Sequence, residues 1–270
     1  MCNVSIIMGV YNNQTTLRQA LDSIISQTYN DWEFVICDDA STDCSYEILL
    51  EYKQKYPDKI ILLRNSENMK LAFSLNRCLK KARGKYIARM DGDDISNKHR
   101  LEKQVQFLEN NHQYDLVGTL MQSFDKNGLK HIVNIKEIPE KTDLPIFNPF
   151  HHATIMMKKS VFNKLNGYTV SKKTRRMEDV DLWYRFYENK FKGYNMQEIL
   201  YYVREDEAAY KRRKFTYYLD ASKIVWSGVK RLNLPKKYYI YSFKPIMAWL
   251  TPRKLKVYWR KNKFRSKAND

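Results

Sequence analysis

Four short apolar runs alternate with amphipathic stretches along the first third of the chain. The runs cover residues 3–12, 32–37, 60–64 and 85–90. Runs of this length, rich in Val, Ile, Phe and Tyr, are typical of buried strands. Between them, apolar residues recur three and four positions apart, as on one face of a helix, at Leu17, Leu21, Ile24, Ile48, Leu49, Tyr52, Leu71, Leu75 and Leu79. This alternation predicts an α/β fold with a mostly parallel, Rossmann-like central sheet flanked by helices.

Acidic residues directly follow two of these predicted strands. Asp38 and Asp39 come after the second run, and residues 91–94 (Asp-Gly-Asp-Asp) come after the fourth. Because ligands of open α/β sheets bind beyond the carboxyl ends of the strands, these acids mark a candidate site. Carboxylates gathered there need compensation, and a divalent cation with a phosphate behind it is suited to this. The alternative is a solvated turn, since Asp-Gly is a common turn dipeptide.

Further motifs follow in a fixed order along the chain. They are Val4-Ser5-Ile6-Ile7, Tyr11-Asn12, Gln27-Thr28-Tyr29, Trp32-Glu33, Asp38-Asp39-Ala40-Ser41-Thr42-Asp43, Asn76-Arg77, Gly84-Lys85-Tyr86-Ile87, Asp91-Gly92-Asp93-Asp94, Arg100-Leu101, His152-Ala153-Thr154, Gly167-Tyr168 and Glu178-Asp179-Val180-Asp181-Leu182-Trp183-Tyr184-Arg185. Each motif alone is weak, but the ordered set resembles family 2 inverting glycosyltransferases of the GT-A fold, of the bacterial polysaccharide type. The resemblance runs from Val4 to Tyr202.

The resemblance implies a nucleotide-sugar donor, UDP-linked in preference to dTDP or GDP, bound across the strand tips. The residues expected to hold the donor are Val10, Tyr11, Asn12, Asp39, Asn76, Asp91, Gly92 and His152. Asp91 and Asp93 match the family's Asp-x-Asp (DXD) motif, whose carboxylates reach a divalent metal that bridges the two phosphates. Mn²⁺ or Mg²⁺ suits an all-oxygen site of this kind. His152 is a further candidate metal ligand, as a neutral imidazole, and otherwise an imidazolium facing the phosphates.

The general base expected by resemblance is Asp179, with Glu178 positioning the acceptor or tuning its neighbour. An inverting transfer needs a carboxylate that takes the proton of the acceptor hydroxyl as it attacks the anomeric carbon. The apolar residues around this pair predict an amphipathic helix that begins there. The alternative is that both acids only stabilise the first turn of that helix through its dipole. In the same helix we expect Trp183 in the core, and Tyr184 is a candidate stacking face for an acceptor sugar.

Positive charge is concentrated at the carboxyl end. The net charge is +18, and residues 205–270 hold 18 Lys and Arg against 5 Asp and Glu, a net of +13. We therefore divide the chain into a catalytic domain, 1–204, and a basic, aromatic-rich helical region, 205–270. Basic residues interleaved with Tyr and Trp suit an anionic membrane surface. A solvated basic face is the second interpretation, and nucleic acid is not the expected partner.

No segment has the roughly 20 apolar residues of a spanning helix, and the first strand begins almost at once. Cys2, Cys37, Cys44 and Cys78 form no C-x-x-C pair. We therefore expect a cytoplasmic enzyme, peripheral at the inner face of the cell membrane, acting on a glycan or lipid-linked acceptor. The oligomeric state stays open, with a dimer formed through the basic region as one option.

Two other classes of function remain as hypotheses. One is a nucleotidyltransferase on a related fold, although residues 9–13 (Gly-Val-Tyr-Asn-Asn) are not the Gly-rich basic loop that such enzymes carry. The other is a non-catalytic module that binds membrane or nucleic acid through its basic region. The acids at positions 39, 91, 93, 178 and 179 argue against a degenerate site.

Overall fold

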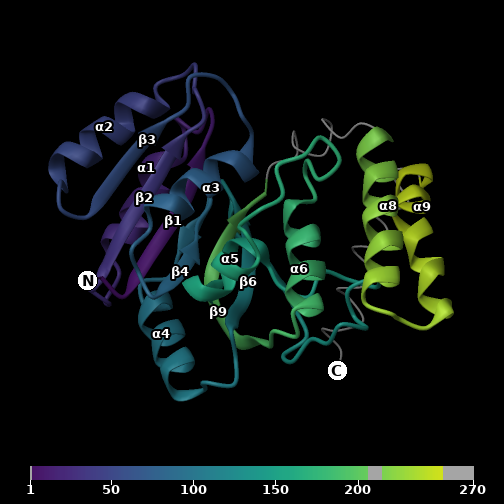
Figure 1. Ribbon diagram of the computed structural model, residues 1–270. Coiled ribbons are helices and arrows are strands. Elements are labelled where there is room, and N and C mark those ends of the chain that lie inside the picture. The colour runs from purple at the N-terminus through teal and green to yellow at the C-terminus, as the bar shows by residue number, and fades with distance from the viewer. Residues whose placement is uncertain (1, 206–214, 252–270) are drawn as a thin grey trace.

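A central sheet with helices on both faces organises the protein (Figure 1). We describe residues 2–205 and 215–251 from a computed structural model. Within these residues nine strands form one sheet in the order β3-β2-β1-β4-β8-β6-β9-β5, with β7 paired to β6. The strands are β1 (Val4–Val10), β2 (Trp32–Asp38), β3 (Ile60–Arg64), β4 (Tyr86–Arg89), β5 (Ile95–Ser96), β6 (Leu116–Asp125), β7 (Gly128–Val133), β8 (Met156–Lys158) and β9 (Gly193–Arg204).

The sheet is mostly parallel, as the sequence predicts. Strands β3, β2, β1 and β4 pair in parallel, and so do β6 and β9. The short strand β8 runs antiparallel between β4 and β6 and joins these two groups. The edge strands β5 and β7 are also antiparallel to their neighbours. The short strands β5 and β8 were not predicted, because strands of two or three residues carry no readable period.

The helices bury apolar residues against both faces of the sheet. They are α1 (Leu17–Ile25), α2 (Ser45–Lys55), α3 (Leu71–Lys81), α4 (Arg100–Asn110), α5 (Lys159–Lys164), α6 (Glu178–Glu188), α8 (Phe215–Arg231) and α9 (Lys244–Leu250), with the 3₁₀ segments η1 (His152–Thr154) and η2 (Lys236–Phe243). Strand β1 shows the division: Ile6 and Met8 face the core under α1, α2 and α4, whereas Ile7 faces the core under α3, α5 and α6. Because side chains alternate along a strand, a strand with apolar residues on both faces must be packed against helices on both faces of the sheet.

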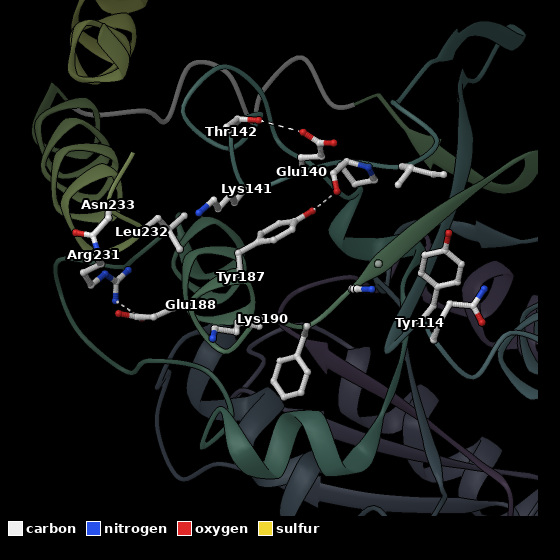
Figure 2. Close-up of a pocket in the computed structure, with 16 residues that line it drawn as sticks. Tyr114, Glu140, Lys141, Thr142, Tyr187, Glu188, Lys190, Arg231, Leu232 and Asn233 are labelled. Atoms are coloured by element: carbon white, nitrogen blue, oxygen red, sulfur yellow. Dashed lines mark hydrogen bonds and ion pairs between the residues drawn. The ribbon is translucent and has the colours of Figure 1, made fainter. Parts of the chain in front are cut away.

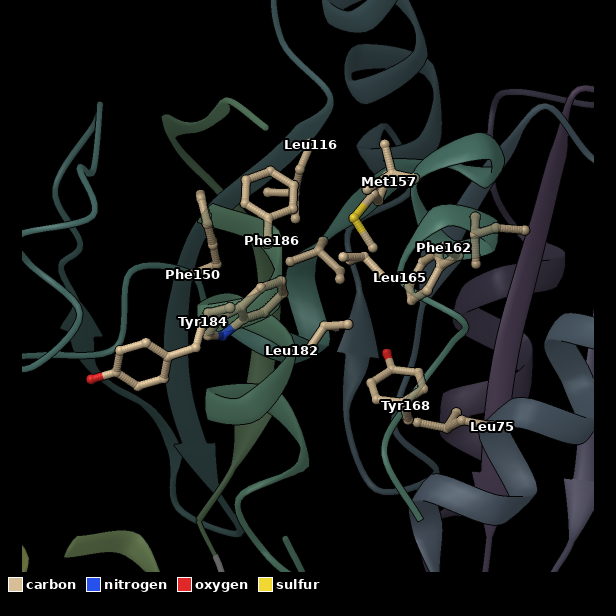
Figure 3. Packing of buried hydrophobic residues seen from close by; sticks show 14 of the residues in the cluster. Leu75, Leu116, Phe150, Met157, Phe162, Leu165, Tyr168, Leu182, Tyr184 and Phe186 are labelled. Carbon is tan, nitrogen blue, oxygen red and sulfur yellow. The ribbon is translucent and has the colours of Figure 1, made fainter. Parts of the chain in front are cut away.

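The core under α6 contains many aromatic side chains (Figure 3). Phe150, Trp183 and Phe186 meet edge to face, with ring centroids 5.1–6.4 Å apart. Trp183 is fully buried, as the sequence predicts. Tyr184 is also fully buried, because α8 packs over it with Gly228 against its ring. The interpretation of Tyr184 as a sugar-stacking face was therefore wrong: its ring closes the contact between α6 and α8.

The carboxyl-terminal region forms a helical layer on the outer side of α6 (Figure 1). Helix α8 contributes Val225 and Val229 to the same core cluster as α6, and η2 and α9 follow against α8. The predicted boundary at 204/205 falls where β9 ends, and residues 206–214 and 252–270 of the predicted basic region lie outside the described residues. No helix in the described part of the chain is both long and apolar enough to span a bilayer.

Candidate active site

The loops that follow β1, β2 and β4 lie side by side, since β1 sits between the other two strands. The loops after β1 and β2 are hydrogen-bonded to each other through Asn12, whose Oδ1 accepts the Thr42 N–H at 2.9 Å. The Asn12 N–H donates to Oγ of Ser41 at 3.1 Å, with the Asn12 backbone at a φ of 55°. The N–H of Asp39 donates to the carbonyl of Val10 at 2.8 Å. Val10, Asn12 and Asp39 are thus brought together as predicted, with the exposed ring of Tyr11 beside them.

Asp39 is buried and holds the start of α3. Its Oδ1 accepts from Nδ2 of Asn65 at 2.6 Å and from the N–H of Met69 at 2.8 Å. Its Oδ2 accepts from the N–H of Lys70 at 2.8 Å, and Lys70 has a φ of 74°. The carboxylate therefore fixes the backbone that leads into α3. Its expected contact with the donor base or ribose stays a prediction.

Asp91 is paired with a buried arginine that the sequence reasoning missed. Arg89, the last residue of β4, is 2% exposed and forms an ion pair with Asp91. Burial lowers the pKa of Arg89, but the Asp91 carboxylate outweighs it, so the net shift is upward and the guanidinium stays charged. The N–H of Asp91 donates to the hydroxyl of Tyr201 on β9 at 3.1 Å. The sequence does carry a signal for this residue: Arg89 stands inside an apolar run, directly ahead of the acids.

The two other acids of this motif differ in their surroundings. Burial, with the charge of Asp91, raises the pKa of Asp93 to about 6. Asp94 is buried, and its Oδ1 accepts the N–H of Arg204 on β9 at 2.8 Å. Asp94 therefore ties the loop to the backbone of β9. The carbonyl of Gly92, between Asp91 and Asp93, accepts from Oγ1 of Thr16 at 3.1 Å, which links this loop to the one after β1.

His152 begins η1 and lies over Tyr168 and Trp183. Its Nε2 is 2.8 Å from the hydroxyl of Tyr168. Burial, with the nearby Arg89, holds the pKa of His152 well below its ordinary value, so the ring is neutral. Burial also raises the pKa of Tyr168, which keeps its hydroxyl protonated. This environment favours the neutral imidazole of the two predicted forms.

Asn76, expected to contact the donor, makes two hydrogen bonds to the backbone of Tyr168. Its Nδ2 donates to the Tyr168 carbonyl and its Oδ1 accepts the Tyr168 N–H, both at 2.8 Å. Gly167 has a φ of +66°, and a Cβ there would overlap Oδ1 of Asn76. Asn76 thereby fixes the segment that carries Tyr168, and its contact with the donor stays a prediction.

Glu178 and Asp179 form the first turn of α6, as predicted. Nδ2 of Asn148 donates to Oδ2 of Asp179 at 2.9 Å, and the Val180 N–H donates to Oδ1 at 2.9 Å. Burial raises the pKa of Asp179, and the hydrogen bond from Asn148 opposes the rise. Burial likewise raises the pKa of Glu178. Asn148 is a further site residue, and the sequence did not single it out within residues 118–149, the stretch expected to lie beside the site.

Arg89 is the common neighbour of these groups. Its charge opposes the rise in pKa of Asp93, Glu178 and Asp179, and it lowers the pKa of His152. The acids at the end of β4 and those at the start of α6 therefore share one electrostatic environment around a buried cation. In the described residues 2–205 and 215–251, no three His, Cys, Asp or Glu side chains gather closely enough to hold a metal unaided. The assignment of Asp91, Asp93 and His152 as metal ligands stays a prediction.

Glu178 also lines a small cavity of about 240 Å³ beside α3. Basic side chains from the start of α3 and from the loop ahead of α6 line the same cavity; they are Lys70, Lys172 and Arg175. Oppositely charged groups thus border the space next to the candidate base. The three cations outnumber the one carboxylate of Glu178, and this excess of positive charge favours an anionic group in the cavity.

A larger cavity of about 790 Å³ lies apart from this site (Figure 2). It is lined by the ends of α6 and α8 and by the loop near Glu140, with Tyr187 donating to the Pro139 carbonyl at 2.8 Å. Gly193, the first residue of β9, also lines it. Because β9 is parallel to β6 and β6 runs in the direction of β4, this is the edge of the sheet opposite the acids. No residue singled out in the sequence as a candidate site residue lines it.

The fold is that of a glycosyltransferase. The family model for glycosyl transferase family 2 matches residues 5–165, so the chain belongs to that family and is a transferase. EpsE of Bacillus subtilis, named as a glycosyltransferase, is 49% identical over 249 residues, covering 92% of this chain and 90% of EpsE. The O-antigen biosynthesis glycosyltransferase WbnJ of Escherichia coli is 32% identical over 236 residues, covering 86% of this chain and 91% of WbnJ.

Solved structures share the fold. TarS of S. aureus in complex with UDP-GlcNAc superposes with a TM-score of 0.69 at 19% identity, over 92% of this chain and 71% of that one. A mannosyltransferase of Pyrobaculum calidifontis in complex with GDP-Man and Mn²⁺ gives a TM-score of 0.63 at 15% identity, over 98% of this chain and 80% of that one. These neighbours confirm the predicted fold class.

Proposed function

We propose that the protein transfers a sugar, with inversion, from a UDP-linked donor to a hydroxyl of a glycan or lipid-linked acceptor in polysaccharide biosynthesis. The observation that carries this is that Asp91 is ion-paired with the buried Arg89, whose charge also acts on Asp93, Glu178 and Asp179. The UDP-GlcNAc in TarS and the O-antigen role in the name of WbnJ support the donor and the pathway class. Family membership favours this function over both alternatives, a nucleotidyltransferase and a non-catalytic module.

The residues present fit a divalent metal. Asp91 and Asp93 offer hard carboxylate oxygens, and the carboxylate of Asp93 is partly buried, where a cation compensates its charge. A site with two protein carboxylates takes its other ligands from substrate phosphates and water, which agrees with the lack of a larger ligand cluster in the described residues. Mn²⁺ or Mg²⁺ held there supplies Lewis-acid stabilisation of the negative charge on the diphosphate. His152, whose ring is neutral, is a further metal ligand in this proposal.

Asp179 is the general base in this proposal. As the acceptor oxygen forms its bond to the anomeric carbon, Asp179 takes the hydroxyl proton. The bond between the anomeric carbon and the donor phosphate oxygen breaks, and its electron pair leaves with the nucleoside diphosphate. Glu178, which lines the same cavity as Lys70 and Arg175, orients the acceptor. The hydrogen bond from Asn148 keeps one oxygen of Asp179 in place while the carboxylate is ionised.

A thermal-shift series with UDP, GDP, dTDP and CDP, each with and without Mn²⁺, tests the donor and the metal. A ligand at 100 times its Kd stabilises the fold by about 2.7 kcal/mol. We expect stabilisation by UDP that depends on Mn²⁺ and is lost in Asp91→Asn/Asp93→Asn. Asp58→Asn, at an exposed loop, is the matched control and keeps the response. Metal-independent stabilisation that survives in the double variant contradicts the metal assignment.

Release of UDP from UDP-sugars in the presence of acceptor tests the reaction itself. Asp179→Asn keeps the size and the hydrogen-bonding capacity of the side chain but cannot accept the proton. We expect this variant to retain the nucleotide-induced thermal shift while losing at least about 100-fold in kcat. An active Asp179→Asn enzyme removes Asp179 as the base and leaves Glu178 as the candidate.

A further inference from the structure

A row of exposed apolar side chains runs along the outer face of η2 and α9. Ile240, Phe243, Met247 and Leu250 are 69%, 55%, 60% and 58% exposed. Their spacing of three, four and three residues places them on one face of the continuous helical segment. We call these four residues the apolar row. Large apolar side chains exposed in a row, rather than scattered singly, mark an interaction surface.

The packing of the carboxyl-terminal region turns this face outward. Helix α8 is the inner layer: it buries Val225 and Val229 and presses Gly228 against Tyr184 of α6. Helix α9 lies on the far side of α8 from α6 (Figure 1) and has no buried residue. Thus α8 has its apolar side covered by the catalytic domain, whereas the described residues provide no such cover for α9.

The sequence around the row carries charge of one sign. Between residues 221 and 269 there are 14 Lys and Arg and no Asp or Glu. Lys236 and Lys237, at the start of η2, are exposed next to the row. An apolar row set in a purely basic segment is complementary to a surface that is apolar below and anionic above. The headgroup region of an anionic bilayer has that structure.

We propose that η2 and α9 dock this protein on an anionic lipid bilayer, with the apolar row inserted below the headgroups and the basic residues at the lipid phosphates. The surface is the cytoplasmic leaflet, whose anionic lipids attract basic segments by about 1 kcal/mol per Lys or Arg. The docking holds the transferase beside acceptors carried in that membrane. Binding to lipid does not depend on the proposed reaction, so either can fail without the other.

Two other occupants fit the row less well. Nucleic acid offers phosphates and base faces, but it has no apolar layer to receive the aliphatic side chains of Ile240, Met247 and Leu250. A second copy of the chain would bring two purely basic segments together, and like charges oppose that contact. The bilayer alone satisfies both the apolar row and the charge.

Flotation with lipid vesicles tests the proposal. We compare phosphatidylcholine vesicles with vesicles enriched in phosphatidylglycerol, at low and high salt. The full chain should bind the anionic vesicles more tightly, and salt should weaken the binding. Phe243→Ser/Met247→Ser/Leu250→Ser should lower the partition coefficient at least about 10-fold, because three apolar groups no longer leave water. Lys236→Glu/Lys237→Glu should weaken binding to the anionic vesicles alone.

The matched control is Leu129→Ser/Ile132→Ser on β7, where the two side chains are 64% and 39% exposed. It removes exposed apolar surface elsewhere and should bind vesicles as the unaltered protein does. Melting temperatures of all variants confirm folding. Unchanged vesicle binding by the triple variant overturns the proposal. It is also overturned if that variant converts a dimer to a monomer in sedimentation while binding vesicles normally, or if duplex DNA of equal phosphate content displaces the protein from the vesicles.

Discussion

The hydrogen bond from Asn148 to Asp179 predicts how the pH dependence of transfer responds to one substitution. Nδ2 of Asn148 donates to Oδ2 of Asp179 at 2.9 Å, and this bond stabilises the ionised carboxylate. Burial already raises the pKa of Asp179. Asn148→Ala removes a group that opposes the rise, so the pKa of Asp179 should move further up.

The size of the shift follows from the strength of one hydrogen bond. A hydrogen bond to an ionised group is worth about 1.5–3 kcal/mol, and about 1.4 kcal/mol corresponds to one pKa unit. Asn148 is exposed, so water replaces part of the lost interaction. We therefore expect the pKa of Asp179 to rise by about 0.5–1 unit.

The assay is kcat/KM of sugar transfer measured against pH. A general base acts in its ionised form, so activity falls as the pH drops through its pKa. In Asn148→Ala the acid limb should lie about 0.5–1 pH unit higher. Asn111→Ala is the matched control, because it removes an Asn amide that bonds the Phe107 carbonyl far from the site, at the end of α4. An acid limb that stays in place or moves to lower pH refutes either the base or its tuning by Asn148.

Three further predictions concern stability and metal. In urea unfolding, Gly228→Ala should destabilise the protein by about 1–3 kcal/mol, because the added Cβ overlaps the ring of Tyr184. This loss should outweigh the better helix propensity of Ala. Equal stability of the variant would contradict the packing of α8 on α6. Glu33 is buried; desolvation raises its pKa, but hydrogen bonds from Ser5 and Arg83 outweigh it and hold the pKa below 4.5. The ionised carboxylate of Glu33 therefore stabilises the fold above pH 4.5, and this stabilisation is lost as the pH falls through the lowered pKa. We expect Glu33→Gln to lower the free energy of unfolding by about 1–2 kcal/mol at pH 7 and to leave it unchanged in acid. A decrease that does not vary with pH would speak against the ion pair. Removal of divalent metal with EDTA should abolish transfer, and Mn²⁺ should restore it; full activity in EDTA would show that Arg89 and the other protein charges suffice.

The sequence alone was enough to predict the parallel half of the fold. Runs such as Ile60–Arg64 have apolar residues on both faces, and helices with one apolar face separate these runs. Each strand and the helix next to it can therefore bury their apolar surface in only one arrangement, with the strands in a sheet and the helices on its faces. The start of α6 at Glu178 was also predictable, because acids followed by an apolar period mark a helix amino terminus. The short strands Met156–Lys158 and Ile95–Ser96 were not predictable, because they are strands only where neighbouring strands pair with them.

For the site, residue types along the chain indicated where acids gather but not what each acid contacts. Asp39, Asp91 and Asp94 look equivalent as acids at strand ends. In the structure Asp39 holds the start of α3, Asp91 pairs with Arg89, and Asp94 binds the backbone of β9. These differences depend on partners between 2 and 110 positions away, and no local pattern encodes such distances.

Charge and apolar periodicity by themselves predicted a basic helical region at the carboxyl end, and its division from the catalytic domain stays a prediction. Whether an apolar side chain there is core or surface was decided by tertiary packing. Tyr184 looked available and is buried under α8, whereas Phe243 and Met247 have the spacing of a core helix and are exposed. Hydrophobic spacing fixes which residues share a face, because helix geometry is local. Which face is covered depends on what the rest of the chain places against it, and that is a property of the folded molecule.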